Sequence, residues 1–524
     1  NGSKYETVTT STGNYTLAAL PVGSYKLSVE QTGFSKSEVA SVTVQVAVTT
    51  RVDVVLQVGQ ASQSIQVDAE STLLKTESAE QSTTVTGEQL NALPINFGIG
   101  AGAIRNPLSF TSMTPGATIN GWNNITVNGT NGGYKILFEG QESNSSLDPR
   151  VSDESQPSVE AIQEFTLQTS NFAPEFGAVT GGLYNFTSRS GTNELHGTGY
   201  LYMQNTAFNA GLPFTDNGNG GHKEIVKHLA DGGFSVGGPV VLPKYNGKNR
   251  TFFFFNWEHY RDREALYNGI TTVPNTDFRN GDLSAILGRN LGTDFAGRPI
   301  LQNEIYDPAT ETFDSSGRRI LQPFQNNVIP VSRFDPVSVK IMQQMPGPNL
   351  GDLLVNNYSA GGPFYKLQTI PSIKIDHNFS NSGKLSGYYS WENTTKSNGV
   401  DGLPEPVSQV RIQDIRSKTF RVNYDQSLTP TLLLHLGAGI QRYNNLDSVP
   451  AESFNYDSKA LGIVNAPGTG FPRLAGGSLG GNTYGGMALA MGPGNRGRYF
   501  DLKPTGVAQL AWVHGNHTYK AGGE

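Results

Sequence analysis

Long runs of alternating apolar and polar residues occupy the chain from about residue 194 onward. In one run Ile373, Ile375 and Phe379 fall on one side of an extended backbone, while Lys374 and Asp376 fall on the other. Successive side chains of a strand point to opposite faces, so a period of two predicts strands with one apolar and one polar face. About nine such runs follow one another, and this region is therefore predicted to form one large antiparallel sheet.

The connections between these runs alternate between short and long. Tight turns are predicted at 380–383, 429–430 and 515–516, and long connections at about 267–367, 398–410 and 446–500. Membrane β-barrels have short turns at one end, long loops at the other and aromatic girdles near the strand ends. Aromatic residues of this kind are Trp257, Trp391, Tyr424 and Trp512. The pattern favours a barrel, with a large soluble β-sandwich or a propeller as the alternatives.

Composition narrows the possible functions. The chain has 524 residues, no cysteine and a net charge of −6. Without cysteine there is no disulfide scaffold, no thiolate metal site and no cysteine nucleophile. The acidic balance gives no electrostatic case for binding nucleic acid. No stretch of 18 consecutive apolar residues predicts a transmembrane helix, but a membrane-spanning strand needs only about 9–11 residues and escapes that search.

The first 193 residues differ from the rest. Within residues 1–58, β-branched residues alternate with mostly polar ones. This pattern predicts a small β-sandwich, including a strand over 52–58. Residues 59–75 are polar and are interpreted as a linker. Residues 76–193 predict a mixed α+β domain, in which Thr86–Gln89 has the form of a capping box. Residues 194–524 carry the barrel-like strands, and the ends of the chain lead us to expect a fragment.

Several motifs resemble one family. Pro157–Phe165 and Gln168–Gly177 resemble the plug-domain motif of Oar-like TonB-dependent transporters, and Gly181–Asn193 with His196-Gly197 resembles the passage from plug to first barrel strand. Further matches are Gly237–Pro239, Asn246–Phe254, Ile305–Pro308, Asn327–Pro330 and Arg333–Pro336. Upstream, Gly13–Tyr15, Leu20–Tyr25 and Gly33-Phe34 resemble a carboxypeptidase regulatory-like domain, which has a carbohydrate-binding-like fold.

Departures from the family pattern are also present. The plug usually reads Val-Asp-Gly where this chain has Val127-Asn128-Gly129. No TonB box is recognised, and such a segment could precede Asn1. The family's barrel has 22 strands and ends in an aromatic residue, whereas this chain stops far earlier. The resemblance therefore implies a mainly β protein: an N-terminal β-sandwich, an α+β plug and the first part of an antiparallel transmembrane β-barrel.

The resemblance also implies a function. The protein is expected in the outer membrane of a Gram-negative bacterium, surrounded by lipid, where it binds an external substrate and imports it through a plugged barrel. The TonB complex is the expected partner on the periplasmic side, and an oligosaccharide or a peptide is the candidate substrate; no nucleic acid partner and no cofactor are expected. The alternative is a surface-attached, β-rich glycan-binding or adhesion protein.

Candidate site residues are few. The substrate-binding candidate is the loop Asn128, Gly129, Thr130, Asn131, Gly132 and Gly133, for which the alternative is a glycine-rich turn between plug strands. Polar side chains expected on the inner barrel face, able to hydrogen-bond a polar plug, are Lys374, Asp376, Lys384, Glu392, Arg421 and Asp425.

No catalytic or metal-binding residues are predicted. Gly476–Gly480 fits the G-x-S-x-G pattern, but the nucleophile elbow needs a strand before it and a helix after it, and here further glycines surround it. His514 and His517 span a predicted hairpin without a third metal ligand. The chain is therefore interpreted as a protein that is not an enzyme.

Overall fold

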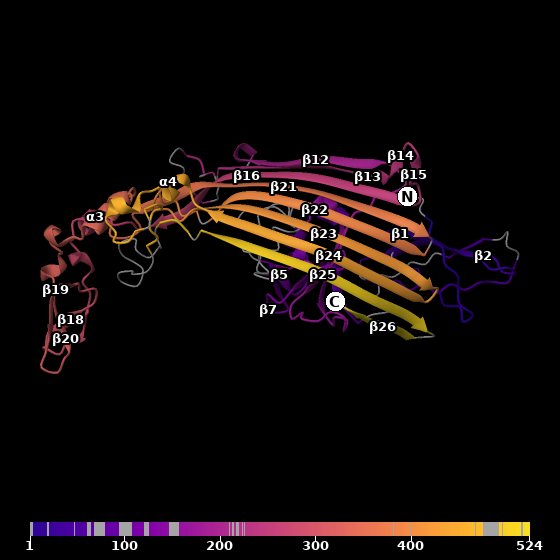
Figure 1. Ribbon diagram of the computed structural model, residues 1–524, viewed down its shortest axis with the longest axis horizontal. Helices are drawn as coiled ribbons and strands as arrows, with labels where there is room; N and C mark the ends of the chain where they lie inside the picture. Colours follow the sequence, from indigo (N-terminus) through magenta and orange to yellow (C-terminus); the bar gives the residue numbers. More distant parts are fainter. Residues whose placement is uncertain are drawn as a thin grey trace.

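The computed structural model describes residues 4–17, 20–46, 48–59, 64–67, 79–93, 107–119, 125–145, 157–208, 210–211, 214–215, 220–222, 224, 226–380, 382–398, 400–466, 468–474, 492–494, 496–514 and 517–524. The described strands form one nine-stranded sheet, one five-stranded sheet and several smaller sheets. The large sheet runs along the long axis of the molecule, with the N-terminal sheet at one end and the longest connections at the other (Figure 1).

The N-terminal sheet has the order β1-β2-β3, formed by β1 (Gly23–Val29), β2 (Lys36–Val44) and β3 (Ser64–Val67). The β1–β2 pair is antiparallel and the β2–β3 pair is parallel. Since β3 lies inside residues 59–75, at least this part of the predicted linker belongs to the first sheet. The strand predicted over 52–58 is not formed: these residues carry only one β-bridge, which joins Val58 to Phe34.

The inner domain, defined here as β4 to β11, contains a five-stranded sheet of order β4-β10-β11-β8-β9. Val85, Leu90, Phe165 and Phe186 belong to its buried core, which also includes Tyr388 from the large sheet. The capping box is confirmed at the start of α1, where Thr86 and Gln89 each cap the other's backbone. Its elements are β4 (Gln81–Thr86), α1 (Gly87–Ala92), η2 (Pro107–Met113), β5 (Ala117–Ile119), β6 (Ile125–Val127), β7 (Thr130–Asn131), β8 (Lys135–Phe138), β9 (Gln141–Glu142), η4 (Val159–Ala161), β10 (Ile162–Ser170) and β11 (Leu183–Ser188).

The large sheet joins its strands in chain order, each antiparallel to the next, as the alternating pattern predicts. Its strands are β12 (His196–Asn205), β13 (Lys227–Pro239), β16 (Thr251–Thr271), β21 (Tyr358–Ser380), β22 (Gly383–Asn398), β23 (Arg411–Thr429), β24 (Leu432–Ser448), β25 (Gly497–His514) and β26 (His517–Gly523). The strands are longer than expected: β21 begins at Tyr358, because Gly361, Gly362 and Pro363 hide the alternation there.

The connections confirm the predicted alternation of short and long, and the tight turn predicted at 515–516 lies outside the described residues. Turns at 240–250, 381–382 and 430–431 close the end of the sheet near the N-terminal domain, and the first of them holds the hairpin of β14 (Val241–Leu242) and β15 (Tyr245–Asn246). Connections at 206–226, 272–357, 399–410 and 449–496 leave from the opposite end. Three of these pack together through Met345, Val407 and Phe471, so they form one cap.

The cap contains several short elements. Its longest helix, α3, begins after Asp335, whose side chain accepts from the Ser338 N–H. The elements beyond the strands of the large sheet are η5 (Thr206–Phe208), α2 (Thr276–Arg279), η6 (Ser284–Ile286), β17 (Asn290–Thr293), β18 (Pro299–Leu301), β19 (Tyr306–Phe313), β20 (Arg319–Pro323), η7 (Gln325–Asn327), η8 (Val331–Arg333), α3 (Pro336–Gln344), α4 (Ala451–Phe454) and η9 (Ser458–Leu461).

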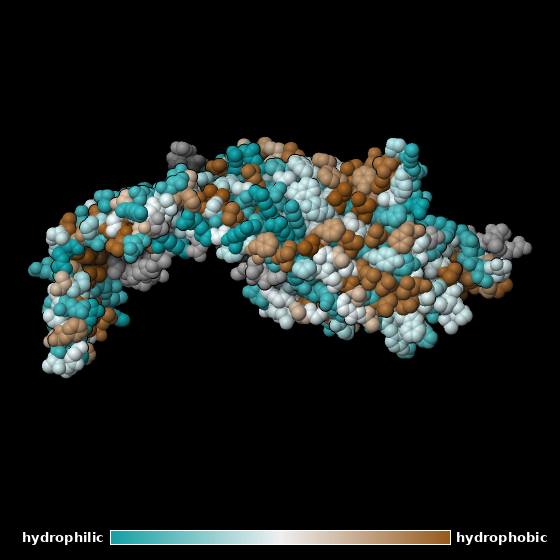
Figure 2. All heavy atoms as spheres, viewed as in Figure 1, coloured by the Kyte–Doolittle hydropathy of each residue, from teal (hydrophilic) through white to brown (hydrophobic). Residues whose placement is uncertain are grey.

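The two faces of the large sheet differ in polarity. Outward residues such as Ile375 and Phe420 are 46% and 45% exposed, whereas inward Lys374 and Arg421 are 5% and 1% exposed. Figure 2 shows apolar residues gathered over the strands toward the short-turn end. A sheet that is apolar outside and polar inside is arranged for lipid on its outer face. None of the helices in the described ranges is both long enough and apolar enough to cross a membrane.

Candidate functional site

The candidate substrate loop is a tight turn with a glycine-rich tail. Asn128 and Gly129 connect β6 to β7 with φ angles of 49° and 82°, both in the left-handed region that two-residue hairpins require. The Asn128 side-chain amide donates to the Thr169 carbonyl oxygen at 3.0 Å. A Cβ atom on Gly133 would lie 2.0 Å from the Thr180 hydroxyl. The geometry is accounted for by the turn, and substrate binding by Asn128–Gly133 stays a prediction.

A second turn carries the main contacts between the inner domain and the large sheet. Glu139 and Gly140 join β8 to β9 with φ angles of 52° and 76°. The turn lies against the inner face of the large sheet. There the Phe138 and Tyr388 rings pack edge-to-face, with their centroids 4.7 Å apart. We call the large sheet the wall, and residues Glu139–Glu142, which contact its inner face, the wall tip.

Buried charges hold the wall tip in place. Lys374 of β21 pairs with the Glu139 carboxylate at 2.9 Å, and the two side chains are 5% and 7% exposed. Glu139 also accepts the Ser188 N–H at 2.6 Å and the Ser188 hydroxyl at 2.8 Å. The carboxylate therefore ties strand β11 to the wall. A buried pair with these extra hydrogen bonds is costly to break, because removing one partner leaves the other charge buried.

Neighbouring wall strands contribute further hydrogen bonds. The Arg421 guanidinium donates to the Glu142 carbonyl oxygen at 3.0 Å, and the Asn423 amide donates to the Glu139 carbonyl oxygen at 2.9 Å. The Gln141 amide in turn donates to the Asn423 side chain at 2.9 Å. Backbone carbonyl groups of the wall tip are thus satisfied by wall side chains, as burial requires.

The six polar residues expected on the inner face have two kinds of partner. Lys374 and Arg421 contact the inner domain directly, and Asp376 accepts from the Ser190 hydroxyl, which follows β11, at 2.6 Å. The other three stay within the wall: Lys384 pairs with Asp376 at 3.1 Å, Asp425 with His435 at 2.7 Å, and Glu392 accepts from Gln368.

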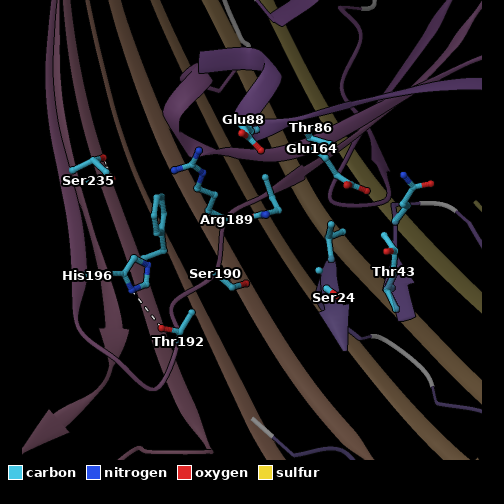
Figure 3. A pocket seen from close by; sticks show the side chains of 18 residues that line it. Ser24, Thr43, Thr86, Glu88, Glu164, Arg189, Ser190, Thr192, His196 and Ser235 are labelled. Carbon is cyan, nitrogen blue, oxygen red and sulfur yellow. Dashed lines mark hydrogen bonds between the residues drawn. The ribbon is translucent and has the colours of Figure 1, made fainter. Parts of the chain in front are cut away.

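The opposite side of the inner domain meets the N-terminal domain. The Val46 N–H donates to the Glu164 carboxylate, and the Thr166 hydroxyl donates to the Val46 carbonyl oxygen at 3.4 Å. Beside this contact lies a cavity of about 680 Å³. Figure 3 looks into it, with Glu164 and Arg189 of the inner domain facing Ser24 and Thr43 of the N-terminal sheet.

Glu164 is the titratable group most affected by this contact. Its side chain is 3% exposed on β10. Burial raises the pKa of Glu164 to about 7, and the hydrogen bond from the Val46 N–H opposes that rise. The carboxyl group can therefore change charge near neutral pH.

Sequence reasoning missed the wall tip. No hairpin was predicted there, because Glu139-Gly140 lacks the Asn-Gly or Asp-Gly signature of the favoured two-residue turn. The other motifs yield no chemical site. Gly476–Gly480 lies outside the described residues, and His514 faces His517 across the β25–β26 hairpin. Among residues the structure describes, no group of three His, Asp or Glu could hold a metal ion.

Comparison with known proteins gives two family matches. Residues 187–524 match the family model described as an outer membrane beta barrel domain, and residues 1–57 match a carboxypeptidase regulatory-like domain. Among curated proteins, the TonB-dependent transporter Oar of Myxococcus xanthus is 27% identical over 293 residues, covering 52% of this chain and 26% of the relative. The chain thus spans about a quarter of that relative's length.

Solved structures with a similar fold are outer-membrane transporters and receptors. The outer membrane transporter YddB from Escherichia coli aligns with a TM-score of 0.44 and 10% identity, over 84% of this chain and 47% of that chain. FpvA of P. aeruginosa, solved with heterologous pyoverdines, aligns with a TM-score of 0.41 and 12% identity, over 85% of this chain and 51% of that chain.

Proposed function

The chain belongs to the outer membrane β-barrel family, which places it in the outer membrane of a Gram-negative bacterium, and we propose that it is the N-terminal part of a TonB-dependent importer. In this proposal the large sheet is the first part of the barrel, the inner domain is the plug, and the TonB complex pulls on it from the periplasm. The observation that carries the proposal is the buried pairing of Lys374 with Glu139, which holds a folded domain against the polar inner face of the sheet.

The arrangement supports binding and gating. The outer face of the sheet is apolar, and the inner face is polar and largely occupied by the inner domain. A domain in that position closes the lumen, and a substrate can pass only after the domain moves or rearranges. The relative in Myxococcus xanthus is named as a transporter. We expect the short-turn end, where the N-terminal domain lies, to face the periplasm.

For the cargo we propose a polar solute, either an oligosaccharide or a peptide. The support is the polar lining of the wall on β21 and β22, which includes Lys366, Gln368, Glu392 and Thr394. These side chains are buried here, and Gln368 and Thr394 both donate to Glu392. After the plug rearranges, they can exchange such partners for hydrogen bonds to a polar solute, and they offer little to an apolar one. The loop Asn128–Gly133 remains the proposed contact on the plug.

Fractionation and gel mobility of the full-length protein test the proposal. We expect it in the outer-membrane fraction, with a shift in mobility when the sample is heated, because a closed barrel resists detergent until it unfolds. Deleting residues 76–193 from the full-length protein should open the lumen and make cells sensitive to large antibiotics that the outer membrane excludes. A soluble protein without a heat-dependent shift would contradict the proposal and favour the surface-attached glycan-binding or adhesion protein.

A further inference from the structure

A short segment of the N-terminal domain covers one face of the inner domain. Residues Gln45 and Val46, which we call the strap, directly follow the end of β2 at Val44. Val46 lies against β10 and makes two hydrogen bonds to it, one from its N–H to the Glu164 carboxylate and one from the Thr166 hydroxyl to its carbonyl oxygen. The contact therefore joins the backbone of the strap to polar side chains of the plug sheet.

The covered face of β10 is polar although it is buried. Glu164, Thr166 and Gln168 alternate along the strand, and their exposed fractions are 3%, 0% and 1%. The residues between them, Phe165 and Leu167, enter the apolar core of the inner domain. If the strap leaves, β10 exposes carboxyl, hydroxyl and amide groups that water can solvate, so the uncovered face carries little hydrophobic penalty.

The strap is not tightly packed against the inner domain and the wall. The cavity of about 680 Å³ lies between the strap, the inner domain and the first strands of the wall. Its walls include Gln45 of the strap, Arg189 after β11 and His196 at the start of β12, and Figure 3 shows the last two to the left of Ser24 and Thr43. Interfaces between domains that are polar and loosely packed are those that open and close.

We propose that the strap is a releasable latch that holds the plug from the periplasmic side through Glu164 and Thr166, and that it leaves β10 before the plug can move. The proposal rests on the assignment of the inner domain as a plug. While the strap is docked, β10 is tied to the N-terminal domain through the two hydrogen bonds of Val46. Once it is released, the wall tip still holds the plug, so release of the strap is a step of its own.

Hydrogen–deuterium exchange on the purified full-length protein in detergent tests the latch. Glu164→Ala removes the acceptor for the Val46 N–H, and we expect exchange in the strap to rise at least tenfold while amides within β1 and β2 keep their protection. Glu164→Gln keeps an oxygen acceptor and should retain most of the protection. Glu38→Gln is the matched control, because Glu38 pairs with Lys26 and Lys36 within the N-terminal domain.

The outcomes separate the latch from its alternatives. Unchanged exchange in Glu164→Ala would overturn the proposal, and so would an equal rise over β1, β2 and the strap, since that pattern means unfolding of the domain rather than release. The readout does not involve transport. A failure here leaves the importer standing, whereas a soluble full-length protein would refute the importer without altering the exchange result.

Discussion

The inner domain is held by two surfaces of opposite character. On the wall side, the buried Lys374–Glu139 pair, the Arg421 guanidinium and the Phe138–Tyr388 ring contact form a dense set of interactions. On the strap side, Val46 makes two hydrogen bonds beside a cavity of about 680 Å³. Breaking the wall contact costs free energy because it leaves buried charges unpaired. Opening the strap contact costs less, because it exposes polar groups to which water can hydrogen-bond.

This difference sets the expected order of events. A force applied from the short-turn end meets the N-terminal domain first and the wall tip last. The weaker surface also holds the group that titrates near neutral pH, Glu164. The structure thus assigns stability to the wall contact and control to the strap contact, and the following substitutions test each assignment.

The largest effect is expected at the wall. Lys374→Met should destabilise the inner domain by about 3–5 kcal/mol, because the Glu139 carboxylate is then buried without its partner. Chemical unfolding of the full-length protein, followed by exchange of amides in β8 and β9, measures the loss. Lys418→Met, at an exposed position of β23, is the control and should change stability by less than about 0.5 kcal/mol. A similar small change for Lys374→Met would remove the distinction between the two surfaces.

The next effect concerns the candidate substrate loop, which belongs to neither surface. Gly133→Ala should cost roughly 2–4 kcal/mol, because φ is +64° and the new Cβ atom would lie 2.0 Å from the Thr180 hydroxyl. Gly129→Ala, with φ of +82° and no atom within 4 Å, should cost about 1–2 kcal/mol from backbone strain alone. Thermal unfolding compares the two variants. Equal losses would mean that the fit against Thr180 does not shape the loop.

A pH-dependent effect is expected at the strap. Burial in the docked state holds the pKa of Glu164 at about 7, above its ordinary value of 4.5, and the strap supplies part of that burial. Docking is therefore strongest below about pH 4.5 and weakens as the pH rises through 7. The docking equilibrium should change by at most about tenfold per pH unit within this window. Charged or titratable groups that share the cavity are Glu88, Arg189 and His196, and the strap contributes none.

Strap exchange rates, corrected for intrinsic chemistry, measure this dependence between pH 5 and pH 8. Glu164→Gln should flatten the profile, because the amide does not titrate. A profile that keeps its slope in Glu164→Gln would show that Glu164 is not the source of the pH dependence. At the wall, exchange in β8 and β9 should follow a different pH profile from that of the strap.

The smallest effect is expected at the helix cap beside the cavity. Thr86→Ala removes the hydroxyl that accepts the Gln89 N–H at 3.3 Å, and should cost about 1 kcal/mol of inner-domain stability. Thr86→Ser keeps the hydroxyl and should change stability by only a few tenths of a kcal/mol. Thermal unfolding of both variants measures the difference, and a Thr86→Ala variant as stable as Thr86→Ser would show that the cap does not support this side of the domain.

Local patterns in the sequence predicted much of the fold. Alternation predicted the strands of the large sheet, and Thr86–Gln89 predicted the start of α1, because each signal lies within a few residues of its structural effect. The strand β3 was missed, since Ser64–Val67 is short and pairs in parallel with a distant segment. The domain boundaries at 58, 75 and 193 remain predictions.

The candidate site was harder to predict. Alternation identified Lys374 and Arg421 as inward-facing, but their partners Glu139 and Glu142 lie more than two hundred residues earlier in the chain. These contacts join residues 235 and 279 positions apart in the sequence, and a local period of alternation cannot predict pairs at such a distance. The strap contact was missed for the same reason, because Val46 and Glu164 meet across 118 residues.

The central claim, that the plug is held firmly by the wall and releasably by the strap, can be tested by cysteine labelling in living cells. The chain has no cysteine, so Thr166→Cys under the strap and Ser143→Cys against the wall are matched single sites with exposed fractions of 0% and 3%. With a small water-soluble maleimide, we expect Thr166→Cys to react at least tenfold faster than Ser143→Cys, and its rate to fall when the TonB system is deleted. Equal rates at the two sites, or rates that do not depend on TonB, would contradict the account.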